Sequence, residues 1–441
     1  MNQTHRRTPL GAGHTPKPSM WWTGLVGVLR QPDFLKLWSG LTVSLVGTQV
    51  SGLALPLTAV LFLGASGTEM GILGAARWLP YLVFGLLAGA WLDRVRRRPV
   101  LIATHVGRAL LLASIPAGAV FGWLRIEQLY VVTLVLGSLM IFSDAAYQAL
   151  LPTLVTREDL VDGNSKLELS RSTAQIVGPG LGGWLVQLVG APLAVAVDAV
   201  AFAFDAMLVT SIRQAEPPPV GAKDGHNLRR EIAEGLRWVF GSPVLRPIQA
   251  ASMSFIGANA VWGTVYVLYA TRDLHLAPAV LGLIFAAGGP GALAGALAAG
   301  AFTRRFGLGF VIVGTHALAA ANFFLIPLAV VLAWLAIPLL MAAAFVGGCA
   351  ITLGSIAELS LRQGMTPHRL QGRMNATMRS LNWSMAALGS LIGGFLGDAI
   401  GFVPTLLIGA GTSLASTAWL VFSPIPRLRE APEVESDVDP S

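Results

Sequence analysis

Long apolar runs separated by short polar stretches dominate this 441-residue sequence. Each run is about as long as the roughly 20 residues that a helix needs to cross a bilayer. Six runs cover residues 36–63, 70–92, 100–123, 129–151, 167–189 and 191–212, and six more cover 248–270, 279–302, 308–332, 336–358, 376–400 and 402–422. The pattern predicts an all-α membrane protein with twelve transmembrane helices.

A polar stretch separates the two sets of runs. It opens with three prolines at 217–219, and residues 229–239 have helical spacing with one apolar side, which predicts an amphipathic helix lying on the membrane. The predicted organisation is a cytoplasmic tail (1–32), a first six-helix bundle (33–212), a cytoplasmic linker with the amphipathic helix (213–246), a second six-helix bundle (247–424) and an acidic cytoplasmic tail (425–441).

Composition and charge agree with this layout. Hydrophobic residues make up 54% of the chain and charged residues only 12%, which excludes an ordinary soluble domain. The net charge of +7 comes from short basic clusters between apolar runs rather than from one basic face, so we expect no nucleic-acid partner. All 30 lysines and arginines except Arg77, Arg108, Arg125 and Arg272 fall on one side of the predicted layout. By the positive-inside rule both termini are expected to be cytoplasmic.

The two halves also repeat. Sliding the sequence against itself by 211 positions, the separation of Gly89 and Gly300, aligns many small residues. The matched pairs include Gly71 with Gly282, Arg94 with Arg305, Gly137 with Gly348, Asn164 with Asn375, Gly178 with Gly389, Gly182 with Gly393, Gly183 with Gly394 and Gly190 with Gly401. This predicts two pseudo-symmetric six-helix repeats related by an axis along the membrane normal.

The basic segment from Gly89 to Arg98 lies between the second and third runs. This segment has a glycine, an Asp-Arg pair four residues later and then a basic pair. The pattern resembles the loop after the second helix of major facilitator superfamily transporters. The resemblance implies the major facilitator fold and a cytoplasmic latch made by Gly89, Asp93, Arg94, Arg97 and Arg98, with a weaker second copy at Arg304 and Arg305. In such a latch the arginines can pair with Asp93 or with Glu158, Asp159 and Asp162. The alternative is that these arginines only set the topology.

A second motif lies in the fifth run. Gly178, Pro179, Gly182 and Gly183 form an element similar to one found in drug and metabolite antiporters of this superfamily. Glycine and proline flatten and bend a helix, so a partner helix can approach closely. The expected partners are the small residues of the eighth run, Gly288, Gly289, Gly291 and Gly295. A general packing kink, shared with importers, is the alternative.

Ionisable residues inside the apolar runs are functional candidates, because charge is costly in hydrocarbon. They are Arg108, Asp144, Asp198 and Asp205. A carboxylate paired with Arg108 can bind and release a proton as its solvation changes. A purely structural ion pair is the alternative. We expect Arg77, Glu69 and Glu358 to be interfacial or latch residues, and His105 and His316 to be hydrogen-bonded core residues.

Polar and aromatic residues within the apolar runs are candidates for the cavity lining. They are Gln49, Gln175, Asn259, Trp262, Tyr266, Asn382 and Trp383, with Ser44 and Thr48 beside them. Few charges and several aromatics suit a bulky amphipathic substrate, although ordinary packing explains each residue equally well when it is taken singly.

Three further segments narrow the resemblance. Residues 33–38, 150–155 and 234–239 resemble the branch that contains bacterial macrolide-efflux and enterobactin-type siderophore exporters. The resemblance implies a secondary active transporter of a bacterial inner membrane that exports a drug-like or siderophore-like molecule, in exchange for protons, by alternating access. Its partners would be the small-molecule substrate, protons and membrane lipid. We expect a monomer with no cofactor and no metal.

Other functions stay open at this point. Uptake or facilitated diffusion of a metabolite would use the same fold. A membrane sensor or assembly factor usually carries a soluble output domain, and the predicted layout leaves no room for one. Residues 64–67 resemble the serine motif of rhomboid proteases, but they fall in a predicted loop with no histidine on a suitable partner helix. We therefore expect no enzyme activity.

Overall fold

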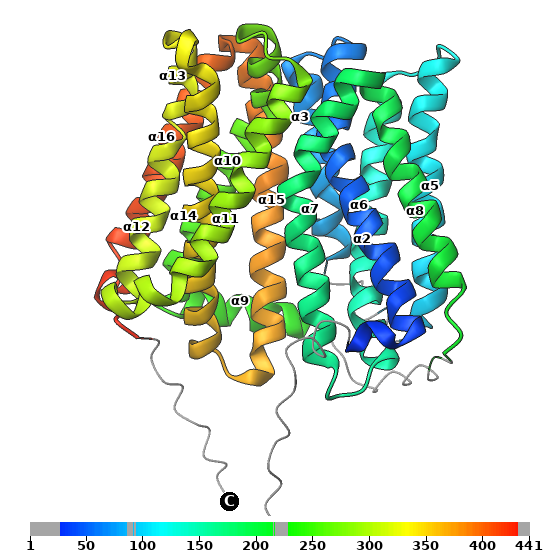
Figure 1. Ribbon diagram of the computed structural model, residues 1–441. Helices are drawn as coiled ribbons and strands as arrows, with labels where there is room; N and C mark the ends of the chain where they lie inside the picture. The colour runs from blue at the N-terminus through cyan, green and yellow to red at the C-terminus, as the bar shows by residue number, and fades with distance from the viewer. Residues whose placement is uncertain (1–26, 86–90, 92–93, 215, 217–227, 431–441) are drawn as a thin grey trace, which may run out of the picture.

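The computed structural model describes residues 27–85, 91, 94–214, 216 and 228–430, and in that part of the chain the regular structure is entirely helical (Figure 1). Two of the predicted latch residues, Gly89 and Asp93, lie outside the described residues. The helices run alternately up and down between two ends of one bundle (Figure 1).

The first part of the chain contributes six long helices. Their bounds are α2 (Pro32–Leu57, continued by the π-helical η2, Thr58–Phe62), α3 (Gly67–Phe84), α5 (Arg97–Val120), α6 (Ile126–Leu154), α7 (Leu160–Val189) and α8 (Ala191–Thr210), with the short η1 (Val28–Arg30) ahead of them.

The second part begins with α9 (Leu228–Gly241). It continues with α10 (Leu245–Leu268, with the π-helical η3, Tyr269–Asp273), α11 (Pro278–Phe306), α12 (Leu308–Asn322), α13 (Leu325–Val331), η4 (Ala333–Leu335), α14 (Ala336–Met365), α15 (His368–Ile400), α16 (Phe402–Val421) and η5 (Ile425–Arg427). Every expected apolar run coincides with helix over its described residues, and residues 86–90 and 92 of the second run lie outside them. The ninth run is interrupted between α12 and α13, ahead of Pro327, which has no N–H to continue the helical hydrogen bonds.

Ten helical segments in the described part of the chain are long and apolar enough to cross a membrane. The two other long helices, α3 and α7, are not among them. The first turns of α7 carry Asp162, Lys166, Glu168 and Arg171, which lower its hydropathy, and the described part of α3 ends at Phe84.

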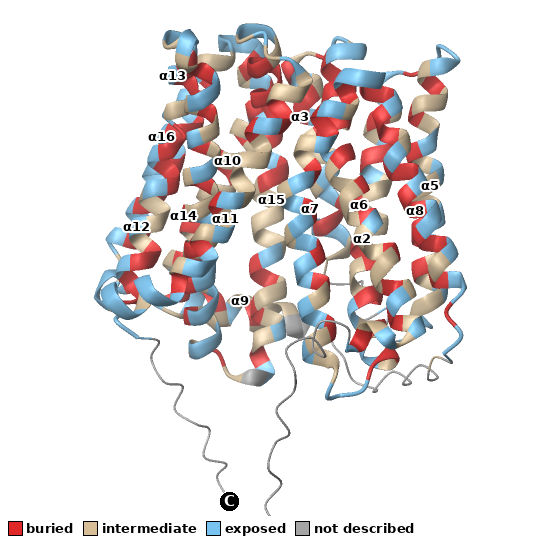
Figure 2. Cartoon of the chain, in the orientation of Figure 1, coloured by how far each residue is buried: buried red, intermediate tan, exposed pale blue. Residues whose placement is uncertain are grey.

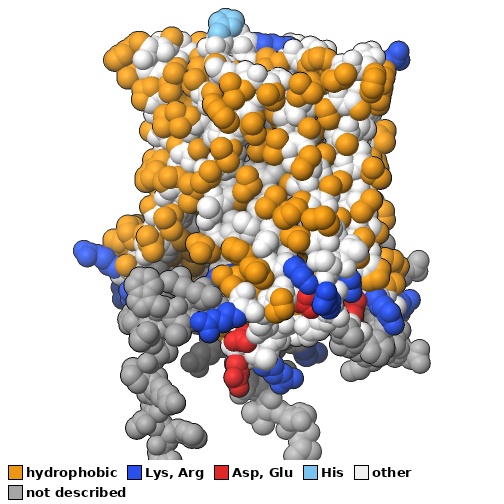
Figure 3. Space-filling view, turned by 45° about the vertical axis from the view of Figure 1, so that its right-hand side comes forward, with side chains coloured by type: hydrophobic (Ala, Val, Ile, Leu, Met, Phe, Trp, Pro, Cys, Tyr) orange, Lys and Arg blue, Asp and Glu red, His pale blue; other side chains and the backbone are white. Residues whose placement is uncertain are grey.

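Charge gathers at one end of the bundle. We call this the basic end; it is the end where α2 and α5 begin and where α8 and α16 finish, at the bottom of Figure 1. In Figure 3, blue Lys and Arg side chains form a belt there, whereas the body above it is mostly apolar. Buried residues run along the inner faces of the helices, and the outward faces are largely exposed (Figure 2). Exposed apolar side chains on such faces suit contact with lipid.

The element bounds repeat with the offset of 211 residues that the sequence contains. α8 and α16 match end to end at this offset, as do the π-helices η2 and η3, and α3 and α11 begin at equivalent residues. Gly190 and Gly401, which precede α8 and α16, both have positive φ, at 87° and 90°. The chain therefore makes the same turn at equivalent positions of its two parts.

Two close helix crossings join the two parts. A Cβ placed on Gly183 of α7 would lie 2.8 Å from the Cα of Gly282 of α11, and one placed on Gly394 of α15 would lie 2.7 Å from the Cα of Gly71 of α3. Any side chain there would force the helices apart, so both crossings require glycine. The two crossings are equivalent at the offset of 211.

The amphipathic helix α9 lies at the basic end against α15 (Figure 1). Gly235 fits against Thr377 and the backbone of Arg373, and Glu234 forms an ion pair with Arg373. The Trp238 indole donates a hydrogen bond of 3.3 Å to the Thr366 hydroxyl. These contacts attach the linker helix to the second part of the chain.

We expect Gly401→Ala to destabilise the protein. Gly401 has φ 90° and ψ 167°, a region open almost only to glycine, where a side chain costs about 1–3 kcal/mol. Thermal unfolding in detergent should show a melting temperature lower by a few degrees. Gly411→Ala is the matched control, because a Cβ on Gly411 meets nothing within 4 Å and the residue lies inside α16. Equal melting temperatures for the two variants would contradict the prediction.

Candidate functional site

Arg108, Asp198 and Asp205 are brought together inside the first part of the bundle, from α5 and α8. Asp198 is 2% exposed and Asp205 is 0% exposed. The Arg108 guanidinium lies over the Phe202 ring, 3.7 Å from its centroid, and the carboxylates that act on it electrostatically are Asp198, Asp144 and Asp205. None of the described carboxylates comes within 4.0 Å of the guanidinium, so the structure holds a group of charges rather than a direct ion pair.

Asp205 is held by α2 and α5. The Ser44 hydroxyl donates a hydrogen bond of 2.9 Å to Asp205 Oδ2, and Nδ1 of His105 lies 3.4 Å from the same oxygen. Gly40 leaves room for this carboxylate, since a Cβ there would collide with Oδ1. Oδ1 itself has no hydrogen-bond partner among the described residues. A buried carboxylate with so few donors is costly to keep charged, which is unusual for a purely structural residue.

Asp198 and Asp144 extend the group along the bundle. Asp198 faces α2, where Thr48 and Ser51 lie beside it and Gly47 makes room for it. Asp144 of α6 is half-buried, and the positive groups that act on it are Arg108, Arg171 of α7 and Arg379 of α15. Asp144 is therefore the member of the group whose electrostatic surroundings include arginines of both parts of the chain.

The second part of the chain lacks these charges. At the offset of 211, Arg108, Asp144, Asp198 and Asp205 correspond to Ala319, Ser355, Gly409 and Ser416, whereas His105 corresponds to another histidine, His316. Nε2 of His316 lies 3.0 Å from the Ser416 hydroxyl, so the equivalent helix pair makes the same contact with a neutral partner. The helix packing does not require the charges.

Three neighbouring cavities lie between the helices. The first, about 470 Å³, is lined by residues of α2, α7, α10, α11, α12 and α14; the second, about 240 Å³, lies between α2, α3, α10 and α15; the third, about 260 Å³, lies among α10, α12, α14 and α15. Each pair of cavities has wall residues in common: Asn259 lines the first and second, Ile256 lines the second and third, and Ala319 and Ile351 line the first and third. We call them the aromatic, tryptophan and acidic chambers.

The structure distributes the seven cavity candidates among these chambers. Gln49, Gln175, Asn259, Trp262 and Tyr266 line the aromatic chamber, Trp383 and again Asn259 line the tryptophan chamber, and Asn382 lines the acidic chamber. The indole N–H groups of Trp262 and Trp383 are buried and have no hydrogen-bond partner among the described residues. Trp383 stacks on Trp78 of α3, with ring centroids 4.2 Å apart.

Glu358 is a site residue that sequence reasoning missed. We expected it to be interfacial or part of a latch, but it lines the acidic chamber together with Arg362 and His316. Its side chain is 19% exposed, and it is the only carboxylate among the wall residues of the three chambers. Its position in the last turn of an apolar run, four residues before an arginine, was the available signal. By contrast, Asp144, Asp198 and Asp205 line none of the chambers.

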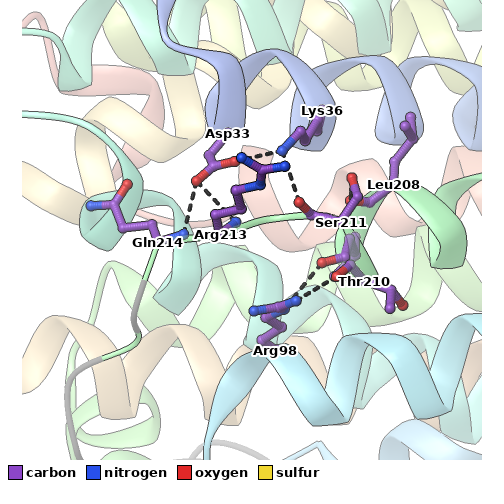
Figure 4. A network of polar contacts seen from close by, with 9 residues as sticks. Asp33, Lys36, Arg98, Leu208, Thr210, Ser211, Arg213 and Gln214 are labelled. Atoms are coloured by element: carbon purple, nitrogen blue, oxygen red, sulfur yellow. Dashed lines mark hydrogen bonds and ion pairs between the residues drawn. The ribbon is translucent and has the colours of Figure 1, made fainter.

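The latch arginines make their contacts within the first part of the chain. Arg97 Nη1 lies 3.5 Å from Glu216, whose carboxylate also accepts hydrogen bonds from the N–H groups of Arg97 and Arg98 at the start of α5. Arg98 donates to the carbonyls of Val209 and Thr210 at the end of α8 (Figure 4). A cation there complements the negative end of the helix.

Beside Arg98, Asp33 and Lys36 complete this network (Figure 4). Asp33 accepts hydrogen bonds from Lys36 and from the N–H groups of Arg213 and Gln214, and Lys36 donates to the Ser211 carbonyl at 2.8 Å. The expected acidic partners of the arginines bond elsewhere: Asp162 accepts from the Val28 N–H and pairs with Lys166, and Asp159 accepts from Gln31. Arg94, Arg304 and Arg305 are exposed.

The glycine motif of α7 faces two helices. Gly178 and Gly182 pack on Gln49 and Val50 of α2, and Gly183 packs on Gly282 of α11, beside Pro179. Of the expected partners, Gly289 meets Ile176 of α7, whereas Gly288, Gly291 and Gly295 face α14. The described residues contain no group of three or more His, Cys, Asp or Glu side chains that could hold a metal ion.

Comparison with known proteins identifies the family. A family model described as transmembrane secretion effector matches residues 23–440. The chain is 29% identical over 416 residues to the multidrug efflux pump Tap of Mycolicibacterium fortuitum, covering 91% of this chain and 97% of that protein. It is 26% identical over 386 residues to the enterobactin exporter EntS of Citrobacter koseri, covering 86% and 88%.

A solved structure shares the fold. An inward-facing bacterial homologue of the iron transporter ferroportin gives a TM-score of 0.71 at 15% identity, covering 89% of this chain and 98% of that one. A bacterial homologue of ferroportin in an outward-facing state gives a TM-score of 0.57 at 16% identity, covering 88% of this chain and 98% of that one. The resemblance inferred from sequence is confirmed: the chain belongs to the transmembrane secretion effector family of major facilitator superfamily transporters.

Proposed function

We propose that this transporter exports a drug-like or siderophore-like molecule in exchange for protons, by alternating access around the three chambers. Two observations carry the proposal. The aromatic and tryptophan chambers are lined by residues of both parts of the chain, and the five hydrogen bonds between described residues of the two parts all lie at the end opposite the basic end. The printed functions of Tap and EntS, an efflux pump and an exporter, support the direction of transport.

The proposed architecture is twelve spans in two six-helix bundles. We include α3 and α7 as spans because α3 packs along α15 and α7 packs along α11, both of which are long and apolar enough to cross a membrane. The repeated element bounds and the two equivalent glycine crossings support a pseudo-twofold relation between residues 33–212 and 247–424.

The proposed orientation places the basic end in the cytoplasm of a bacterial cell, with both chain termini there. The belt of Lys and Arg in Figure 3 supports this assignment through the positive-inside rule. We call the opposite end the outer end.

Five hydrogen bonds join the two bundles among the described residues, and all of them lie at the outer end. Asp398 of α15 accepts from the N–H groups of Gly67 and Thr68 at the start of α3, at 2.6 and 2.7 Å, and Gln187 of α7 accepts from the Ala279 N–H at the start of α11, at 3.2 Å. The other two run from Arg272 to the carbonyls of Gly64 and Ala65. These contacts support a state that is closed outside and accessible from the cytoplasm.

The contacts of Asp398 with the start of α3 and of Gln187 with the start of α11, which we call the two helix caps, are equivalent. Gln187 and Asp398 are related by the offset of 211, and so are Thr68 and Ala279. In each bundle, a side chain near the end of one helix therefore accepts hydrogen bonds from N–H groups at the start of a helix in the other bundle. Opening the outer end requires both caps and both glycine crossings to separate, which fits a rocking motion of two rigid bundles.

The latch arginines suit the same state. Arg97 and Arg98 contact Glu216 of the linker and the end of α8, rather than the second bundle. In the outward-open state we propose that the basic loop approaches the second bundle and stabilises closure at the cytoplasmic end.

The charged group of the first bundle is the proposed proton site. The neutral counterparts in the second bundle indicate that packing alone does not need Arg108, Asp198 and Asp205. Buried ionisable groups that packing does not require are functional candidates in a membrane protein. Asp144, whose electrostatic surroundings include Arg379 of the second bundle, offers a connection between proton binding and the motion of the bundles.

We expect Asp205→Asn to uncouple export from protons. Asparagine keeps the size of the side chain and an acceptor for Ser44, but it cannot exchange a proton. In proteoliposomes, export of a drug-like compound driven by an imposed pH gradient should fall by about tenfold or more. Exchange of the same compound across the membrane without a gradient should be retained.

Asp273→Asn is the matched control, since it makes the same chemical change at an exposed residue outside the charged group. If wild-type export is unaffected when the pH gradient is collapsed, proton antiport is wrong. Equal losses in both transport assays would instead indicate a structural role for Asp205.

We also expect a cross-link across the outer end to stop transport. Cysteines at Gln187 and Ala279, introduced with Cys349→Ser, can be joined by a short bis-methanethiosulfonate, which forms a disulfide with each thiol, because the Gln187 side chain reaches the Ala279 backbone. The linked protein should lose transport, and reduction should restore it. Undiminished transport by fully linked protein would rule out opening at this end.

A further inference from the structure

The acidic chamber adjoins the aromatic chamber, because Ala319 and Ile351 line both. Its wall contains a carboxylate, Glu358, with an arginine one turn away on the same helix. At the offset of 211 these two residues correspond to Tyr147 and Leu151. The first bundle packs the equivalent helix without a charge at either position, so the pair is not demanded by the fold.

Glu358 has spare capacity to accept hydrogen bonds. Its nearest cation is Arg362, whose Nη1 lies 3.6 Å from Oε1, longer than the 2.7–2.9 Å of a charge-assisted hydrogen bond. Its one hydrogen bond among the described residues comes from the Ser252 hydroxyl, at 3.4 Å. A carboxylate has about four acceptor positions. Since the side chain is 19% exposed, a group that enters the chamber can occupy the others.

Aromatic rings connect this carboxylate to the larger chamber. Phe255 lies on the wall of the acidic chamber, and its ring centroid is 5.9 Å from that of Phe323. The Phe323 centroid is in turn 5.6 Å from that of Trp262. The ring centroid of Tyr266 is 4.4 Å from that of Trp262, and the ring centroid of Phe285 is 5.4 Å from that of Tyr266. The faces of such rings attract cations and accommodate flat apolar groups.

We propose that Glu358 binds a positively charged nitrogen or phosphorus centre of the substrate while the aromatic row holds its apolar body. The preferred cargo would then be a cationic aromatic amphiphile, and Glu358 a specificity-determining residue. This inference rests on the proposed export function, but it concerns recognition and does not depend on proton coupling.

The test is equilibrium binding to the purified full-length protein, without any ion gradient. Tetraphenylphosphonium is the cationic probe and triphenylphosphine oxide is a neutral probe of similar shape. Wild-type protein should bind the cation about tenfold or more tightly than the neutral compound, as expected for one buried charge-assisted contact. Glu358→Gln should lose that preference and keep its affinity for the neutral probe.

Glu127→Gln is the matched control, because it makes the same change at an exposed residue of α6 outside the chambers, and it should leave both affinities unchanged. Equal binding of the two probes by wild-type protein overturns the proposal, as does a variant that loses both affinities alike. Either result leaves the export assay in liposomes as a separate test, so the proposed function can stand if this inference fails.

Discussion

Two glycine crossings, Gly71 with Gly394 and Gly183 with Gly282, are the contacts on which the arrangement of this transporter depends. Helices in a bilayer gain little from burying apolar side chains against one another, so close backbone contact and hydrogen bonds hold them together. Between the two parts of the chain, the two glycine crossings and the hydrogen bonds of the described residues lie at the same end. The opposite end carries the basic belt. In the account proposed above, this asymmetry is what allows the two bundles to rock.

The repeat separates what the fold needs from what function needs. Helix bounds, π-helical segments and positive-φ glycines recur at the same offset, and so does the histidine contact between equivalent helices. The charges of the candidate sites do not recur: at this offset Arg108 and Asp205 correspond to Ala319 and Ser416, and Glu358 corresponds to Tyr147. In the account proposed above, protons bind in the first bundle and cationic cargo is recognised in the second.

Much of the fold could be predicted from sequence, because hydropathy periodicity and the offset of 211 depend on local residue patterns. Contacts between distant helices could not. The motif at 178–183 indicated close packing, but its partner is Gly282, before the glycines expected at 288–295, since register between helices depends on geometry along their whole length. Glu358 was assigned to an interface because hydropathy gives depth along a helix and not the direction of a side chain. The proton and cavity candidates remain predictions about function.

The central claim is reciprocal opening of the two ends, and interspin distances in lipid nanodiscs test it most directly. Labels at Glu127 and Ile337 report the outer end, and labels at Glu158 and Arg369, which are related by the offset of 211, report the basic end; all four positions are exposed. The account predicts that a change of pH which lengthens the distance at the outer end shortens the distance at the basic end. Distances that stay fixed, or that change in the same direction at both ends, would contradict it.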